Sequence, residues 1–403
     1  MSVIKKISAS KIKDSRGNPT LSVSVRTDDG FEGIFEVPSG ASTGSHEAYE
    51  MRDEGGNVRG AIETINTLIA SELTGVEVTN QYAIDDALCE LDGTENKSRL
   101  GGNALIGVST AVLKCAAKAS GAEVYEYLRE MISIPSSREV PYLFVNLING
   151  GKHVEEGSLF QEHIIIPDTE SATRAYQIAY VVKSALEELL RDTFSESGIG
   201  RGDEGGFSFG VERVEEAFGI LADAIYRASM DEKVYMGTDV AATSFFSGEK
   251  YHIDTGSVDR EELLSLYGSF IKEFNLWSIE DPFYEEDFES FCRLHKTHDD
   301  VFVIGDDLTV TNKDRIEKAV KSNAINAVII KPNQIGTIRE TLEAMHYARN
   351  AGLELVVSHR SGETMDDFIA DLAYAFGCFG LKAGAVGVPE RDAKYKRLIE
   401  ISS

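Results

Sequence analysis

From Pro141 to the C-terminus the chain alternates short apolar runs with amphipathic helical segments. Parallel strands that helices cover on both faces have such continuous apolar runs. The pattern extends over about 260 residues, the usual size of a β/α barrel. We therefore expect a TIM-type (β/α)8 barrel with strands at residues 142–148, 160–166, 234–239, 277–280, 301–306, 327–331, 353–359 and 381–383.

The barrel is expected to depart from the regular pattern at its start. Only a short polar stretch, residues 149–159, separates the first two apolar runs. A parallel crossover needs a dozen or more residues and usually contains a helix. We therefore expect these two strands to be antiparallel and the α/β barrel to be a modified one.

The residues before Pro141 have a different sequence pattern. Alternating residues at 21–25, a turn at 28–30 and an extended pattern at 31–37 predict a hairpin. Apolar positions from Ala61 to Leu73, with Leu68 among them, and the run 104–119 predict two helices. We expect a smaller N-terminal α+β domain at 1–132, a linker at 133–140 and the barrel domain at 141–403.

Charged or ionisable side chains stand at the ends of successive predicted barrel strands. In a parallel barrel the C-terminal ends of the strands meet at one face, where active sites are built. A single acid there is more often a helix N-cap than a ligand. The combination of acids, lysines and a His-Arg pair nevertheless predicts one site, made of Asp239, Glu280, Asp306, Lys331, His359, Arg360 and Lys382.

The residue types at these strand ends indicate a chemistry. Three carboxylates without His or Cys suit a hard cation such as Mg²⁺, so Asp239, Glu280 and Asp306 are the candidate ligands. Lys331 and Lys382 are expected to lower each other's pKa by repulsion, which would allow one of them to act as a base. A base beside a metal site indicates a reaction in which the base removes a proton from a substrate carbon next to a carboxylate.

Two loops complete the predicted site. Glu204 lies in a glycine-bounded loop, residues 202–206, and is a candidate general acid, with a plain turn as the alternative. After the run 353–357 the chain reads Ser358-His359-Arg360-Ser361, and we expect residues 362–364 to open a helix. An arginine beside a helix N-terminus would suit a phosphate. The alternative is a loop in which Arg360 pairs with a surface carboxylate.

Charge and cysteine usage exclude several classes of function. A formal net charge of -27 argues against nucleic acid or an anionic membrane as the main partner. The four cysteines have no paired spacing, so neither a zinc site nor a disulfide framework is predicted, and a reducing cytoplasm fits best. No signal peptide or apolar stretch of about 20 residues is apparent.

The segment Gly40–Gly44 also matches the GxSxG pattern of a serine hydrolase, with Ser42 as the nucleophile. That motif requires a strand, a sharp turn and a helix in the middle of a sheet. Here the segment follows Pro38 after a terminal hairpin, so it does not fit the hydrolase motif. It does not match a phosphate-binding P-loop either, because no Lys follows Gly44. We expect a mobile loop instead.

The chain resembles the enolases, or phosphopyruvate hydratases, over nearly its whole length. The resemblance implies a Mg²⁺-dependent lyase with two ions per site, which interconverts 2-phosphoglycerate and phosphoenolpyruvate in glycolysis and gluconeogenesis. It also implies a homodimer or a higher homo-oligomer. The matching segments are 14–20 (DSRGNPT), 37–44 (VPSGASTG), 92–98 (DGTENKS), 160–162 (FQE), 202–207 (GDEGGF), 278–282 (SIEDP), 305–312 (GDDLTVTN), 333–337 (NQIGT), 358–364 (SHRSGET) and 393–395 (AKY).

The resemblance implies a role for each matched residue. Lys331 would remove the C2 proton, Lys382 would stabilise the charge that develops, and Ser42 would bind the second Mg²⁺. Glu204 would help the C3 hydroxyl leave, with His359 near that hydroxyl. The first Mg²⁺ would be held by Asp239, Glu280 and Asp306, and the substrate would contact His153, Glu162, Lys331, Arg360, Ser361 and Lys382.

Several positions depart from the usual enolase pattern. Ser244 replaces a usual Glu, Pro332 follows Lys331, and His163 stands where Phe is common. Segments 154–156 and 381–391 also differ, but none of these changes removes a matched catalytic residue. They bear on loop closure, rate and substrate discrimination, because supporting residues place the reacting groups. The alternatives are another acid-sugar dehydratase or racemase on the same barrel, and an enolase-like protein retained for binding.

Overall fold

The computed structural model describes residues 2–40, 44–154 and 157–403, so the predicted metal residue Ser42 lies outside the described residues. At the N-terminus, β1 (Ile4–Lys13), β2 (Pro19–Thr27) and β3 (Glu32–Glu36) form an antiparallel sheet in that order. The predicted hairpin corresponds to β2 and β3. The preceding strand β1 was not predicted.

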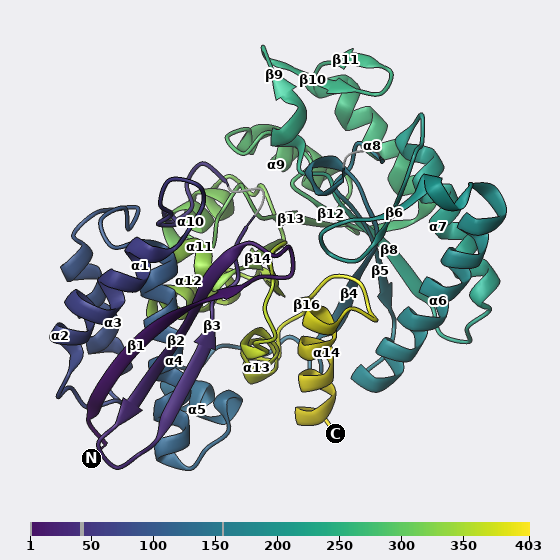
Figure 1. Cartoon of the computed structure of the whole chain (residues 1–403). Helices are drawn as coiled ribbons and strands as arrows, with labels where there is room; N and C mark the ends of the chain where they lie inside the picture. Colours follow the sequence, from purple (N-terminus) through teal and green to yellow (C-terminus); the bar gives the residue numbers. More distant parts are fainter. Residues whose placement is uncertain (1, 41–43, 155–156) are drawn as a thin grey trace.

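Helices follow this sheet (Figure 1). Helix α4 packs on β2 and β3, and its predicted range 104–119 lies within the observed one. The predicted face 61–73 is interrupted by a π-helical turn, Ile65–Ile69, whose wider turn rotates Leu68 outward to 50% exposure. The helices are α1 (Arg59–Thr64), α2 (Ala70–Leu73), α3 (Gln81–Asp92), α4 (Gly102–Ser120) and α5 (Val124–Met131).

The rest of the chain forms a closed barrel. Its sheet has the order β16-β15-β14-β13-β12-β8-β5-β4-β7-β6, and pairing of β16 with β4 closes a ring of eight strands. Strand β5 is antiparallel to both of its neighbours, as predicted for its pairing with β4. The ring strands are β4 (Tyr142–Asn149), β5 (Glu162–Pro167), β8 (Val234–Asp239), β12 (Leu276–Glu280), β13 (Phe302–Gly305), β14 (Ala327–Ile330), β15 (Glu354–Ser358) and β16 (Gly380–Lys382).

Helices surround the ring (Figure 1). They are α6 (Ala172–Thr193), α7 (Val214–Ala228), α8 (Arg260–Phe274), α9 (Phe288–Thr297), α10 (Lys313–Lys321), α11 (Pro332–Ile335), α12 (Ile338–Asn350), α13 (Phe368–Ala375) and α14 (Pro389–Ile401). Two short strands, β6 (Ile199–Arg201) and β7 (Phe207–Phe209), extend the sheet at β4. A separate small sheet contains β9 (Phe246–Ser247), β10 (Lys250–Ile253) and β11 (Gly256–Val258).

The ring strands bury both faces, which explains their continuous apolar runs. In β14, Ala327 and Ile329 belong to a cluster inside the barrel, together with Phe144 and Val356. Residues Val328 and Ile330, between and beyond them, belong to the larger core that includes the helices. Successive side chains of a strand point to opposite faces, so both sides of β14 require apolar residues.

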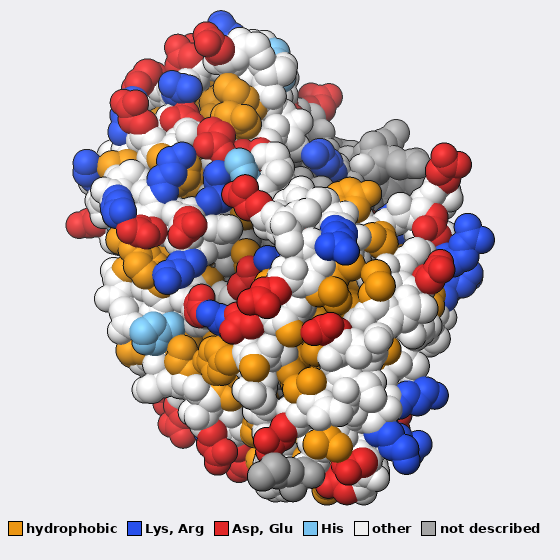
Figure 2. All heavy atoms as spheres, turned by 90° about the vertical axis from the view of Figure 1, so that its left-hand side faces the viewer, with side chains coloured by type: hydrophobic (Ala, Val, Ile, Leu, Met, Phe, Trp, Pro, Cys, Tyr) orange, Lys and Arg blue, Asp and Glu red, His pale blue; other side chains and the backbone are white. Residues whose placement is uncertain are grey.

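On the face shown in Figure 2, acidic and basic side chains are interspersed. Among the described residues, no helix is both long enough and apolar enough to cross a membrane.

Candidate active site

Strand register places three carboxylates in one row. Glu162 at the start of β5 pairs with Asp239 at the end of β8, and Asp239 pairs with Glu280 at the end of β12. Because β5 runs antiparallel, its first residue reaches the same end of the barrel as the last residues of β8 and β12. All three side chains are buried.

Lys382, the last residue of β16, lies among these carboxylates. Its Nζ lies 2.7 Å from an oxygen of Glu280, 3.2 Å from one of Glu162 and 3.5 Å from one of Asp239. Burial alone would lower the pKa of this lysine, but the surrounding carboxylates raise it well above its usual value. The lysine is therefore a fixed positive charge within the acidic row.

Lys331 follows β14 and forms an ion pair with Asp306. Burial opposes its charge, and Arg360 and Lys382 repel it, but the Asp306 carboxylate outweighs these effects and raises the pKa of Lys331. Lys382 thus lowers the pKa of Lys331 by repulsion, as predicted, but the net pKa shift of both lysines is upward. The expectation that one of them is neutral for this reason is wrong for this arrangement, because the neighbouring carboxylates outweigh the repulsion.

Buried negative charge still exceeds what the lysines neutralise. Burial and the nearby Asp239 raise the pKa of Glu280 to about 8, and burial and the nearby Asp306 raise that of Asp307 to about 8. One oxygen of Glu280, Oε1, has no hydrogen-bond partner among the described residues. An all-oxygen donor set with excess negative charge fits a hard divalent cation.

The structure brings together an acidic triad that differs from the predicted set of metal ligands. Oxygens of Asp281, Asp306 and Asp307 lie within 4.8 Å of one another. Asp281 also accepts hydrogen bonds from the backbone amides of Asp306, at 2.9 Å, and Asp307, at 2.6 Å. Within the described ranges, the predicted ligands Asp239, Glu280 and Asp306 do not form such a group. They are linked instead to Lys382 and Lys331.

The predicted acid Glu204 lies in the loop between β6 and β7. One oxygen accepts a hydrogen bond from Asn146 at 3.0 Å, and the other lies 3.3 Å from His359 Nε2 and 3.9 Å from His153 Nδ1. Ligand atoms of Glu162, Glu204 and His153 fall within 4.8 Å of one another. Burial and the charge of Glu204 raise the pKa of Glu162 well above its usual value. Burial would also raise the pKa of Glu204, but the nearby His359, His153 and Arg391 lower it well below its usual value, so the proton of this carboxyl pair resides on Glu162.

Arg360 and Ser361 lie together at the corner that was predicted to hold a phosphate, called the phosphate corner below. Arg360 is buried and donates to Glu47 at 2.8 Å and to Asn333 at 3.1 Å. The alternative of pairing with a surface carboxylate is wrong, because the Glu47 side chain is itself buried. The guanidinium is thus held at the site by partners on other segments.

Residues 362–364 do not open a helix, contrary to the prediction, because α13 begins at Phe368. The Glu363 side chain accepts the backbone N–H groups of Arg360 and Thr364, which holds this segment as a loop. Backbone groups of Ser39 and Gly362 exchange two hydrogen bonds, at 2.8 and 2.9 Å. The N-terminal domain therefore supports the corner where a helix N-terminus was expected.

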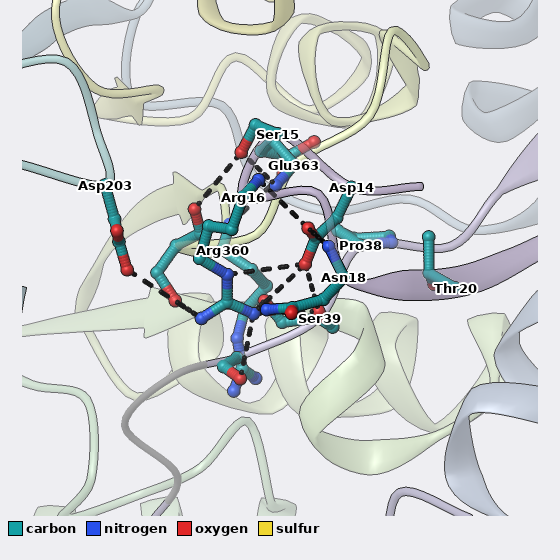
Figure 3. A network of polar contacts seen from close by, with 12 residues as sticks. Asp14, Ser15, Arg16, Asn18, Thr20, Pro38, Ser39, Asp203, Arg360 and Glu363 are labelled. Atoms are coloured by element: carbon teal, nitrogen blue, oxygen red, sulfur yellow. Dashed lines mark hydrogen bonds and ion pairs between the residues drawn. The ribbon is translucent and has the colours of Figure 1, made fainter. Parts of the chain in front are cut away.

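Arg16 lies within segment 14–20, which matches the enolases, but no role for it is predicted from the sequence. Figure 3 shows its guanidinium between Asp14, Ser39 and Asp203. It donates to Asp14 at 3.2 Å, to the Ser39 hydroxyl at 3.0 Å and to the Ser361 hydroxyl at 3.4 Å. Asp203 lies 3.9 Å away, next to the acid Glu204 in the chain. Long-range contacts of this kind carry no local periodicity, so the sequence gives no signal for them.

A central cavity of about 30 Å³ collects these groups, enough for roughly two water molecules. Every predicted site residue that the structure describes either lines this cavity or, for Glu280, contacts a lining residue. The lining includes His153, Gln161, Glu162, Glu204, Asp239, Asp281, Asp306, Asp307, Lys331, Ser358, His359, Arg360, Ser361 and Lys382.

The fold and site define a barrel enzyme that uses buried carboxylates and lysines for acid–base chemistry. Family models described as the N-terminal domain and the C-terminal TIM barrel domain of enolase match residues 4–128 and 137–403. The chain belongs to the enolase family, and this membership implies dependence on a metal ion.

Proteins named enolase align with nearly the whole chain. The protein of Methanopyrus kandleri is 41% identical over 406 residues, which cover 98% of this chain and 94% of the relative. The protein of Sulfolobus acidocaldarius is 40% identical over 399 residues, covering 99% and 95%. The protein of Methanocaldococcus jannaschii is 41% identical over 404 residues, covering 99% and 94%.

Proposed function

We propose that this enolase-family lyase catalyses the reversible dehydration of 2-phosphoglycerate to phosphoenolpyruvate, in glycolysis and gluconeogenesis. The observation that carries the proposal is the position of two strands in the ring. Strand β14, which precedes Lys331, lies four strands from β5, which begins with Glu162, in either direction around the eight-stranded ring. A base and an acid pair therefore face each other across one cavity.

Lys331 is the proposed base and Glu204 the proposed acid. Lys331 must release the proton that Asp306 stabilises before it can accept one from C2, so this ion pair has to loosen when the site is loaded. The C2–H bond breaks, and its electron pair passes into the substrate carboxylate. The electrons then return to form the C2–C3 double bond, while the C3 oxygen leaves as water with the proton from Glu204.

The remaining groups bind and orient the substrate. Arg360 and Ser361 hold the phosphate, and Lys382 stabilises the charge that gathers on the substrate carboxylate. His153 contacts the substrate from its loop, and His359 lies beside Glu204 near the leaving hydroxyl. Glu162, whose pKa is raised well above its usual value, is the protonated carboxyl beside Glu204 and would supply the proton that Glu204 passes to the leaving hydroxyl.

The cofactor is proposed to be Mg²⁺, with two ions per site. Asp239, Glu280 and Asp306 would hold the first ion and Ser42 the second. Support comes from the oxygen-only donor set, the excess buried charge and the unpartnered oxygen of Glu280. When bound, the ions would supply positive charge that stabilises the negative charge formed as the C2 proton leaves.

Assembly, location and domain limits complete the proposal. We propose a homodimer or a higher homo-oligomer in the cytoplasm, with a domain at 1–132, a linker at 133–140 and the barrel domain at 141–403. The small-molecule substrate is the expected partner, with no role for nucleic acid or a membrane.

The test is the absorbance of phosphoenolpyruvate. Purified protein is given 2-phosphoglycerate with and without Mg²⁺, and chelation followed by return of Mg²⁺ is the control for metal dependence. Formation of phosphoenolpyruvate only with Mg²⁺ supports the proposal. Folded protein that binds Mg²⁺ but forms no phosphoenolpyruvate contradicts it. Dehydration of unphosphorylated acid sugars in its place would favour a different enzyme on the same barrel.

A further inference from the structure

Arg391 is a fully buried arginine at the start of α14 and contacts two parts of the site at once. Its Nη1 donates to His359 Nδ1 at 2.5 Å and to the carbonyl of Arg360 at 2.6 Å. Its Nη2 donates to the carbonyls of Ser361 at 2.6 Å and Asp203 at 3.0 Å. One guanidinium therefore joins the acid loop to the phosphate corner.

The contact between Arg391 and His359 determines where the imidazole carries its proton. A guanidinium has five donors and no acceptor, so His359 Nδ1 must accept and cannot carry hydrogen. In a neutral imidazole the proton is then on Nε2. That nitrogen lies 3.3 Å from a carboxylate oxygen of Glu204. This nitrogen makes no hydrogen bond to any described residue, so the Glu204 carboxylate is the nearby acceptor available to its N–H.

The ring is also held in place sterically. A Cβ at Gly384 would lie 3.0 Å from Arg391 Cδ, 3.0 Å from His359 Cε1 and 2.9 Å from the Glu204 carbonyl oxygen. Gly384 has a φ of +84°, which favours glycine. Backbone therefore packs directly against the arginine, the histidine and the acid loop, and leaves the imidazole little room to turn over.

We propose that Arg391 is a positioning residue for the dehydration: it holds His359 as the Nε2–H tautomer and aims that N–H at Glu204. The inference rests on the proposed function, in which Glu204 delivers the proton to the leaving hydroxyl. His359 then orients the acid and takes no proton from it. The mobile proton stays on the Glu162–Glu204 pair.

The charges around His359 support this assignment. Burial, together with the Arg391 charge, lowers the pKa of His359 to about 4, although Glu204 and Glu363 act in the opposite direction. A proton added at Nδ1 would have to replace the arginine hydrogen bond and would place two cations in contact. The ring therefore stays neutral while the carboxyl pair exchanges its proton.

The first test determines the tautomer of His359 in the absence of substrate, so it does not depend on catalysis. Wild-type protein carrying ¹⁵N-labelled imidazole rings is examined by NMR between pH 6 and 8, and His359→Gln identifies the signals of His359. The expected result is an unprotonated Nδ1 and a protonated Nε2 throughout this range. A proton on Nδ1, or a doubly protonated ring at pH 7, overturns the inference. The result does not depend on whether phosphoenolpyruvate is formed, so it is separable from failure of the proposed function.

Variants test the consequence for catalysis. Arg391→Met should lower kcat roughly 100-fold, because the acid is misoriented, while KM changes less than about threefold, since the phosphate-binding side chains remain. The His359 signals should show a mixture of tautomers, and Arg391→Lys should restore part of both properties. A folded Arg391→Met protein with wild-type kcat and an unchanged tautomer overturns the proposal. If that variant does not fold, the Arg391→Lys variant and the wild-type spectrum decide.

The matched control is Arg397→Met on the same helix. Arg397 binds Asp371 at 2.8 Å and Glu123 at 2.7 Å, away from the cavity. The same substitution there removes polar contacts of α14, one of them partly buried, without touching the site. It should lower stability while leaving kcat and the His359 tautomer unchanged. Equal losses of kcat in both variants would show that α14 packing alone accounts for the effect, which contradicts a positioning role.

Discussion

The Nζ of Lys382 lies 2.7 Å from a carboxylate oxygen of Glu280, and both side chains are almost completely buried. The two residues come from the ends of β16 and β12, which are not neighbours in the ring. Their contact crosses the mouth of the barrel. A cation from the chain is therefore already part of the acidic row that we propose as a metal site.

Replacing this lysine tests whether it serves the reaction. Lys382→Met should lower kcat by about 10²- to 10³-fold, the usual loss when one preorganised charge stabiliser is removed. Mg²⁺ binding, measured by calorimetry without substrate, should be retained or strengthened, because the carboxylates lose a competing cation. Weaker Mg²⁺ binding, with kcat unchanged when Mg²⁺ is saturating, would show that Lys382 supports the metal site and not the reacting charge.

His163 gives a prediction for pH-dependent stability. Burial lowers its pKa to about 4 in the folded protein, against about 6.5 in the unfolded chain. The unfolded state therefore binds more protons between these values, and stability is lost as pH falls from about 6.5 to about 4. The full loss is on the order of 3 kcal/mol.

His163→Phe removes this titration and packs a ring of similar size against Phe218, whose ring centroid lies 4.6 Å from that of His163. Denaturant unfolding at several pH values should show a smaller loss of stability below pH 6 in the variant than in wild type. The exposed His252 is the control, and His252→Gln should leave the pH dependence unchanged. Parallel curves for wild type and His163→Phe would contradict the assignment of a neutral buried imidazole.

Arg16 gives a prediction about the phosphate corner. Lysine keeps the charge but loses the planar fork that reaches Asp14, Ser39 and Ser361 together. We expect Arg16→Lys to raise KM for 2-phosphoglycerate about tenfold and to lower the unfolding free energy by about 1 kcal/mol. The control is Arg26→Lys: Arg26 is exposed on β2, the strand that follows the Arg16 loop, and its replacement should change neither quantity. An unchanged KM in Arg16→Lys would show that the network supports folding alone.

Strand ends were predictable because their signal is local. The apolar runs of β12, β14 and β16 identify these strands. Each run stops at a charged residue, Glu280, Lys331 or Lys382, and so also identifies the side chain at the end of its strand. The antiparallel position of β5 was also predictable, since the connection to it is too short for a crossover helix. Together these features predict, from the sequence alone, that most of the site residues lie at one end of the barrel.

Other features depend on contacts that periodicity does not encode. Strand β1 was missed because its residues Ile4–Lys13 are mixed with lysines and serines, and its pairing with β2 is set by the sheet. The outward position of Leu68 depends on one π-helical turn. The Ser39–Gly362 pairing and the Arg391–His359 hydrogen bond join segments hundreds or tens of residues apart. Even the charge state of Lys331 depends on how close Asp306 lies.

Removal of the C2 proton by Lys331 is the step on which the proposed dehydration depends. Exchange of that proton with deuterium reports this step and can be followed by NMR of 2-phosphoglycerate in D₂O with Mg²⁺. Wild type should exchange the C2 position, and Lys331→Ala should show no exchange while still binding Mg²⁺ and remaining folded. Exchange at the wild-type rate in a folded, Mg²⁺-bound Lys331→Ala protein would contradict the account.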